Sequence, residues 1–207
     1  MRPLARGYIH RIAFFVACGA SALLLKHSHG ALELTANSIY CLSLIGMFAV
    51  SALYHSRYWS RPHYLLIRRI DHAAIFILIA GTATPICLLG LNESLGLRLI
   101  LMMWAVAAIG IPLTVFSTHS PKWLRALFYV ALGWLAFPFL HDIEIALGPS
   151  NLWLLIIGGI FYTVGALLYA LKWPNPFPRH FGYHEIFHAF VVIASGCHFK
   201  VIYTLTK

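Results

Sequence analysis

The chain has 207 residues, of which 60% are hydrophobic and only 10% are charged. A soluble globular domain is about half apolar and one-quarter charged, so this composition excludes a soluble enzyme, a disordered chain and a fibrous protein. The 15 Lys and Arg outnumber the 6 Asp and Glu, but they sit in short connections between apolar runs. This placement follows the positive-inside rule of membrane proteins and argues against nucleic acid as a partner.

Seven apolar runs of about 20 residues follow one another, and each is long enough to cross a bilayer as a helix. Only helices and closed barrels can span lipid, and these runs lack the short alternating pattern of barrel strands. We therefore predict an all-α, seven-transmembrane helix bundle in which residues 1–207 form a single domain. The predicted spans are Tyr8–Leu25, Thr35–His55, Asp71–Leu91, Gly96–Phe116, Trp123–Leu140, Leu152–Leu171 and Tyr183–Leu205.

The basic residues divide unequally between the two sides of such a bundle. With the N-terminus in the cytoplasm, eleven of the 15 fall on the cytoplasmic side: Arg2, Arg6, Arg11, Arg57, Arg61, Arg68, Arg69, Lys122, Arg125, Lys172 and Arg179. The other four are Lys26, Arg98, Lys200 and Lys207. This bias predicts a cytoplasmic N-terminus and a C-terminus on the outer side, which is the reverse of the orientation of G-protein-coupled receptors and argues against that class.

The four cysteines lie inside apolar runs and show no CxxC spacing; they are Cys18, Cys41, Cys87 and Cys197. We interpret them as small buried hydrophobic residues and not as disulfides or metal ligands. Gly158, Gly159 and Gly165 allow close helix approach in the sixth span, either within one chain or between chains.

Three polar clusters interrupt the apolar runs, although such groups are costly in lipid. Ser51 and His55 end the second span, Asp71 opens the third, and His184 and His188 open the seventh. In the predicted orientation the second span ends at the cytoplasmic surface, and the third and seventh begin there. All three clusters therefore fall at one depth, in the inner leaflet.

Histidine spacing in these clusters points to a metal site. His184 and His188 are one helical turn apart and share a face, so both can bind one ion, and His55 offers a third nitrogen from another helix. Three protein ligands with a fourth position left for water are typical of a catalytic zinc site.

Asp71 and Ser51 are the other functional candidates. For Asp71 the alternative is an ion pair with Arg68 or Arg69, and for Ser51 it is a small residue at a helix contact. His72 is adjacent to Asp71 but points about 100° away around the helix, which fits helix packing equally well.

The remaining histidines are interpreted differently. Those at membrane edges, hydrogen-bonded to lipid or a loop, are His10, His27, His29, His63, His119, His141 and His180. His198 lies about 21 Å along the helix from His184, so it belongs to the other leaflet and cannot join the cluster.

The segment His184-Glu185-x-x-His188 also matches the helical HExxH motif of zinc peptidases, in which the glutamate is the general base. This alternative gives Glu185 the central role and leaves His55 and Asp71 without one.

The three clusters together resemble the hemolysin III family, the bacterial branch of the progestin and adipoQ receptor superfamily. The resemblance lies in SALYH from Ser51 to His55, in DHAAIFILIAGTATP from Asp71 to Pro85, and in HEIFHAFV from His184 to Val191. It implies seven helices and a zinc ion near the cytoplasmic face, with His55, His184 and His188 as ligands. It also implies that Asp71 holds the metal-bound water and that Ser51 is the serine one turn before the first ligand.

We therefore expect a Zn²⁺-dependent hydrolase of lipid amide or ester bonds in the bacterial inner (plasma) membrane, with membrane lipids as partners. Zinc lowers the pKa of a bound water to about 7, and Asp71 would take its proton before attack on a lipid carbonyl. Thr82, Thr84 and Pro85 favour a kink in the third span that opens a lipid-accessible cavity, or ordinary helix packing.

Besides the peptidase, two alternatives from other classes stay open. The zinc could be structural in a non-enzymatic regulator or receptor of membrane state, or the protein could be cytolytic, as the family's name suggests.

Overall fold

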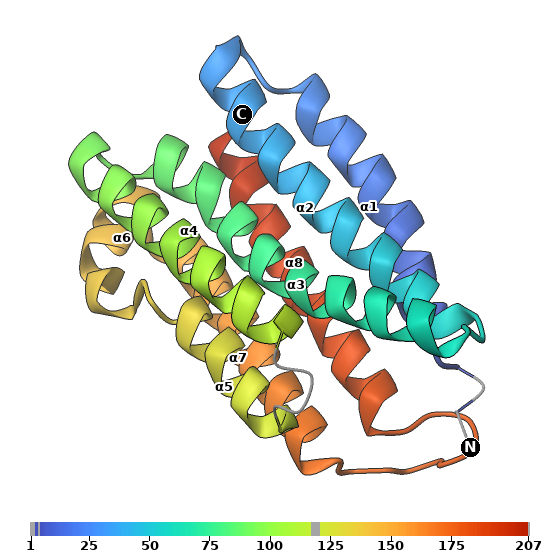
Figure 1. The fold of residues 1–207 in the computed structure, drawn as a ribbon. Coiled ribbons are helices and arrows are strands. Elements are labelled where there is room, and N and C mark those ends of the chain that lie inside the picture. The colour runs from blue at the N-terminus through green and yellow to red at the C-terminus, as the bar shows by residue number, and fades with distance from the viewer. Residues whose placement is uncertain (1–2, 4, 117–120, 207) are drawn as a thin grey trace.

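A computed structural model describes residue 3 and residues 5–116 and 121–206 of the chain. Arg2, His119 and Lys207 lie outside the described residues, as does the side chain of Lys122. The described part is a bundle of α-helices in which the N-terminus and the C-terminus lie at opposite ends (Figure 1).

The helices are α1 (Tyr8–Lys26), α2 (Gly30–Ser56), α3 (Arg61–Pro85), α4 (Glu93–Phe116), α5 (Lys122–Gly133), α6 (Leu140–Leu147), α7 (Pro149–Leu171) and α8 (Tyr183–Leu205). Among the described residues, seven segments are long and apolar enough to cross a membrane, which confirms the predicted all-α bundle of seven spans. Large apolar side chains such as Phe15, Ile109 and Leu167 are more than half exposed, as expected of helices that face lipid.

The fifth span differs from the predicted continuous helix. It reaches from Trp123 to Leu147 but is broken after α5, where a turn and the 3₁₀ turn η2 (Phe137–Phe139) precede α6. Pro138 has no N–H to donate to the preceding turn, so an α-helix cannot continue normally through it. Non-helical backbone at membrane depth is tolerated where it lines a cavity, and Trp134 and Phe137 do so here.

The third span ends in a change of helix type at Pro85. A π-helical turn, η1 (Ile86–Gly90), follows α3 directly, and such turns mark local disruption of the helical ladder. Thr82 lines an internal cavity, whereas the Thr84 hydroxyl accepts a hydrogen bond from Trp104 Nε1 at 3.1 Å. One of the two threonines therefore faces the predicted cavity and the other fixes helix packing.

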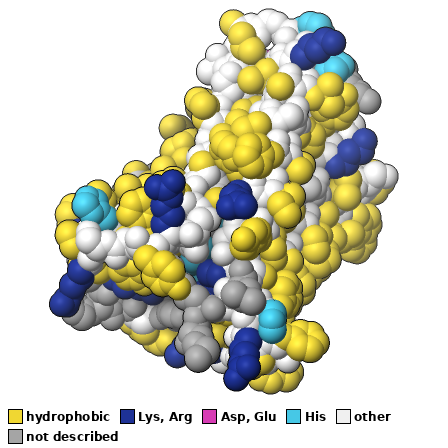
Figure 2. Space-filling view, turned by 90° about the vertical axis from the view of Figure 1, so that its right-hand side faces the viewer, with side chains coloured by type: hydrophobic (Ala, Val, Ile, Leu, Met, Phe, Trp, Pro, Cys, Tyr) yellow, Lys and Arg dark blue, Asp and Glu magenta, His cyan; other side chains and the backbone are white. Residues whose placement is uncertain are grey.

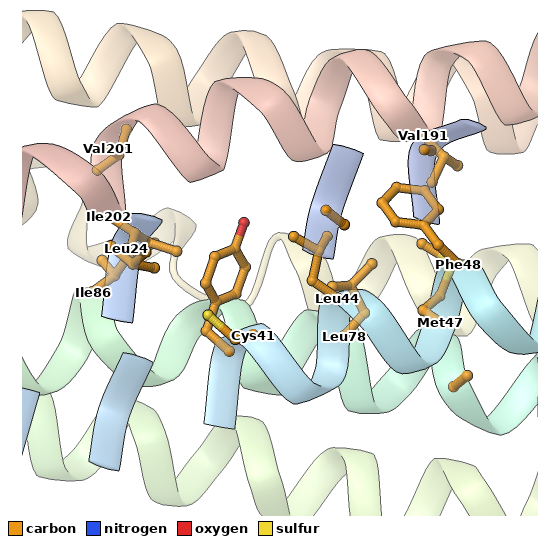
Figure 3. Close-up of a cluster of buried hydrophobic side chains, with 14 of the residues drawn as sticks. Leu24, Cys41, Leu44, Met47, Phe48, Leu78, Ile86, Val191, Val201 and Ile202 are labelled. Carbon is orange, nitrogen blue, oxygen red and sulfur yellow. The ribbon is translucent and has the colours of Figure 1, made fainter. Parts of the chain in front are cut away.

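Helix α8 passes through the middle of the bundle and shares its main core with α1, α2 and α3 (Figures 1 and 3). Figure 3 draws Leu24 of α1 and Ile86 near Ile202 of α8, and Phe48 of α2 near Val191 of α8; all five belong to one buried cluster.

Two features of the small residues follow from this packing. A side chain on Gly158 would meet the ring of His198, and one on Gly165 would meet Phe190, so both glycines serve close approach within the chain. All four cysteines are free; Cys41 and Cys87 are buried, and Cys18 and Cys197 are half-buried.

The charged side chains are distributed unevenly over the surface. Figure 2 shows the side of the bundle that lies to the right in Figure 1. Apolar side chains cover much of it, and Lys and Arg gather mostly in the lower half, toward the N-terminal end. On this face the bundle thus has one basic end, as the predicted spans require. Which end faces the cytoplasm stays a prediction.

Candidate metal centre

Three histidines converge at the N-terminal end of the bundle. His55 comes from the last turn of α2, and His184 and His188 come from the first two turns of α8. One ring nitrogen from each lies within 4.8 Å of the others, and each side chain is at most 9% exposed. The structure therefore brings together the three residues that the sequence pattern selects.

Local structure positions each of these side chains. Helix α8 begins after Gly182, whose N–H donates to Glu185 Oε2 at 2.9 Å, so the helix has a fixed first turn. The spacing of four residues then places His184 and His188 on one face. Their ring centroids are 4.6 Å apart, and the His55 ring lies 4.7 Å from that of His184.

The donor geometry suits a zinc ion. His184 Nε2 and His55 Nε2 are 3.2 Å apart. Two nitrogens bound at the usual Zn–N distance in a tetrahedral site would be separated by about 3.3 Å. Three neutral imidazoles are also a ligand set that zinc favours, and they leave one position open. These residues therefore fit the metal that their spacing suggests.

Ser51 and Asp71 border the same cavity as the three histidines. Ser51 is buried one turn before His55, and its hydroxyl interacts with the Asp71 carboxylate. Asp71 makes no ion pair with Arg68 or Arg69, all three of which the structure describes. The alternative explanation of Asp71 as half of a surface ion pair is therefore not what the structure contains.

His10 is a site residue that the sequence interpretation placed wrongly. It is only 2% exposed, its ring stacks on that of His188 with centroids 3.8 Å apart and planes 5° apart, and its Nδ1 shares a hydrogen bond of 2.8 Å with Ser51 Oγ. It is not a membrane-edge residue. Its helical spacing could have shown that His10 faces inward. It lies in register with the other buried residues of α1, which are Ala13, Ala17, Ser21 and Leu24, and this spacing marks one face of a helix.

The other histidines mostly match their interpretation. His29, His63, His141 and His180 are exposed, and His27 bonds the carbonyl oxygen of Leu23 at 2.8 Å. His198 bonds the carbonyl oxygen of Leu155, away from the three-histidine group. His72 borders the cavity, and its carbonyl oxygen accepts a hydrogen bond from the Tyr129 hydroxyl.

Glu185, the residue central to the peptidase alternative, is occupied elsewhere. It is 1% exposed; one carboxylate oxygen accepts the Gly182 N–H, and the other forms an ion pair with Arg6. Glu185 is also absent from the lining of the cavity. Its role in this structure is to start α8 and to anchor Arg6.

The cavity has a volume of about 410 Å³ and extends from the three histidines into the bundle. Most of its wall is apolar, including Leu78, Ile86 and Val191, and Thr82, Tyr162 and His198 border it as well as the three histidines. Arg68 and Arg125 also border it. A cavity that is largely apolar but bordered by a few polar groups has the chemistry to hold the apolar chain of a lipid.

The fold and the site define a multi-pass integral membrane protein with a three-histidine candidate metal centre near one end of its bundle. The sequence model of the haemolysin-III related family matches residues 1–199, and the chain belongs to this family. The predicted resemblance is thereby confirmed.

Individual relatives cover nearly the whole chain. Hemolysin-3 of Bacillus cereus is 32% identical over 200 residues, which are 95% of this chain and 88% of that protein. The Hemolysin-3 homolog of Bacillus subtilis strain 168 is 30% identical over 199 residues, 95% of this chain and 90% of that protein. The monocyte to macrophage differentiation factor of Homo sapiens is 26% identical over 207 residues, 96% and 82% respectively.

Proposed function

We propose that this protein binds Zn²⁺ through His55, His184 and His188 and hydrolyses an amide or ester bond of a membrane lipid. The observation that carries the proposal is the convergence of three buried histidines at the head of a largely apolar cavity. An aspartate not engaged in an ion pair borders the same cavity. A metal donor set, a carboxyl group and a largely apolar cavity together support hydrolysis of a lipid more directly than a purely structural role.

A bound zinc ion would supply a Lewis acid that polarises a carbonyl and makes water acidic enough to react near neutral pH. Asp71 is the residue that takes the proton from the attacking water. Ser51, through its contact with the Asp71 carboxylate, holds that carboxylate in place. The apolar wall of the cavity binds the chain of the substrate and keeps bulk water from it.

The position of the site suggests which part of a lipid would react. The three histidines lie at the basic end of the bundle, and the positive-inside rule assigns this end to the cytoplasm. A substrate whose chain occupies the cavity would then place a bond near its headgroup beside the histidines. We accordingly propose that the protein works at the inner leaflet of the bacterial plasma membrane.

The experiment is a product screen with purified protein in vesicles that contain ceramides or diacyl phospholipids, assayed for released fatty acid. We expect release by the zinc-loaded wild type, no release after chelation, and a loss of at least 100-fold in Asp71→Asn, because removing a general base typically costs about 100- to 10,000-fold. Asp71→Asn should still hold its zinc, which separates a catalytic from a metal-binding defect.

Two other outcomes would point elsewhere. Zinc that raises the melting temperature without any lipid turnover would favour a structural metal in a non-enzymatic regulator. Two relatives are named hemolysins, so the same vesicles should carry an entrapped dye. Dye leakage that does not depend on metal would favour a cytolytic activity over the hydrolase.

A further inference from the structure

The segment Ala5–His10, here called the N-terminal clamp, joins the two helices that carry the three histidines. On the α8 side, the Ala5 N–H donates to the carbonyl oxygen of His180 at 3.1 Å, and Arg6 forms the ion pair with Glu185. Helix α1, whose first residues Tyr8–His10 belong to the clamp, packs against both α2 and α8. The clamp therefore fixes the start of α8 relative to the first helix.

On the α2 side the clamp touches the end of the helix that bears His55. Gly7 has a φ of +87°, and a Cβ placed on it would lie 3.1 Å from His55 Cβ and 3.2 Å from the His55 carbonyl carbon. A side chain here would be strained by the positive φ and crowded by His55. Glycine thus allows the backbone of the clamp to rest directly against a histidine of the metal centre.

His10 contacts the site from its other side. Its ring covers the ring of His188 in a parallel stack at 3.8 Å, which limits rotation of the His188 side chain. Phe48 packs edge-on against the His10 ring at 5.1 Å, so His10 is held in place as well. Its Nε2 is buried without a hydrogen-bond partner, and Nδ1 makes the hydrogen bond to Ser51.

Ser51 connects His10 with the part of the cavity that holds Asp71. Ser51 and Asp71 border the same cavity, and the Ser51 hydroxyl is an interaction partner of the Asp71 carboxyl group. His10 Nδ1 can donate or accept according to its tautomer, and in either case its hydrogen bond restrains the Ser51 hydroxyl. Contacts therefore lead from His10 of α1, through Ser51 of α2, to Asp71 of α3.

We propose that His10 is a positioning residue of the metal centre, which orients His188 by ring stacking and Asp71 through Ser51. This inference rests on the proposed zinc function. Partners that orient metal ligands typically change metal affinity or activity by about 10- to 100-fold when they are removed. The ring contact and the hydrogen bond are separate contributions, so different substitutions can remove one and keep the other.

The test uses three substitutions at one position. His10→Phe keeps a ring against His188 but loses the bond to Ser51; His10→Asn keeps a donor near the place of Nδ1 but loses the ring; His10→Ala loses both. Zinc affinity is measured by competition with a chelator in detergent. The visible absorption of the Co²⁺-substituted protein reports ligand geometry without any need for activity.

We expect His10→Ala to weaken zinc binding at least tenfold and to change the cobalt spectrum. His10→Phe should recover most of the affinity and the spectrum, and His10→Asn should not. When the protein is saturated with zinc, metal affinity no longer limits lipid turnover. His10→Asn should then turn over lipid faster than His10→Phe, because only Asn keeps a polar group that can bond Ser51. Ser21→Ala is the matched control, because Ser21 is buried on the same face of α1 and lies outside the cavity lining.

The outcomes separate the two proposals. Wild-type protein that binds no zinc would overturn the metal centre itself and this inference with it. Wild-type protein that binds zinc, with affinity and cobalt spectrum unchanged in His10→Ala, would leave the metal centre intact and reduce His10 to a packing residue. If His10→Ala does not fold, equal zinc affinities in the Phe and Asn variants would overturn the inference.

Discussion

The two ends of this bundle use the same kinds of polar side chain in different ways. At the C-terminal end, the Asn37 amide nitrogen donates to Ser28 Oγ at 2.9 Å and to Thr206 Oγ1 at 3.0 Å. His198 bonds the carbonyl oxygen of Leu155. At the N-terminal end, His55, His184 and His188 point their nitrogens at one another.

The difference separates packing from a functional site. A polar group that bonds a neighbouring helix or a carbonyl oxygen has met the cost of its burial, and it links helices in lipid. Three imidazoles from two helices instead gather their ring nitrogens at one place, with His184 Nε2 and His55 Nε2 3.2 Å apart. One cation could be bound by all three nitrogens at once, and this shared donor set distinguishes the N-terminal end.

Glu185 lies at the same end as the three histidines, but its carboxylate is engaged by Arg6 and the Gly182 N–H, as in a residue that serves packing. Glu185→Gln removes the charge that Arg6 pairs with, and we expect a loss of about 2 kcal/mol of stability, typical of a hydrogen bond to a charged group. The loss is checked by thermal unfolding in detergent. Lipid turnover should fall by less than tenfold, through loosening of the clamp alone.

The same variant can break the assignment of roles. If Glu185→Gln abolishes turnover while Asp71→Asn keeps it, the glutamate is the general base, as in the peptidase-like alternative, and the role proposed for Asp71 is wrong. Arg6→Gln is the matched control, because it removes the same ion pair from the other side and leaves the carboxylate of Glu185 in place.

Asn37 tests the opposite end with a smaller effect. Asn37→Ala removes the links to Ser28 and Thr206, and side-chain hydrogen bonds between membrane helices contribute about 0.6 to 1.7 kcal/mol. We expect the free energy of unfolding to fall by about that amount, which thermal unfolding detects as a lower melting temperature, and the zinc content to stay unchanged. A loss of zinc in this variant would mean that the two ends are coupled, contrary to the separation drawn above.

Much of the fold and half of the site could be predicted from the sequence. Continuous apolar runs defined the spans because lipid leaves the backbone few choices. The four-residue spacing of His184 and His188, with the alternation of spans, was enough to bring His55 to them. These features depend on local periodicity and on counting membrane crossings.

The remainder depends on contacts that no local pattern encodes. The non-helical backbone before Pro138 borders a cavity whose lining residues come from several helices. His10 lies next to basic residues at the start of a span and resembles an edge residue in the sequence, and only the packing of α1 between α2 and α8 turns it inward. The pairing of Arg6 with Glu185 likewise joins residues 179 positions apart.

The central claim is that the three histidines hold a metal ion, and elemental analysis of purified protein tests it most directly. We predict about one zinc per chain in the wild type and none in the His184→Ala/His188→Ala double variant, with Asn37→Ala retaining its zinc as the control. Wild-type protein that contains no zinc, and takes up none from zinc-containing buffer, would contradict the account.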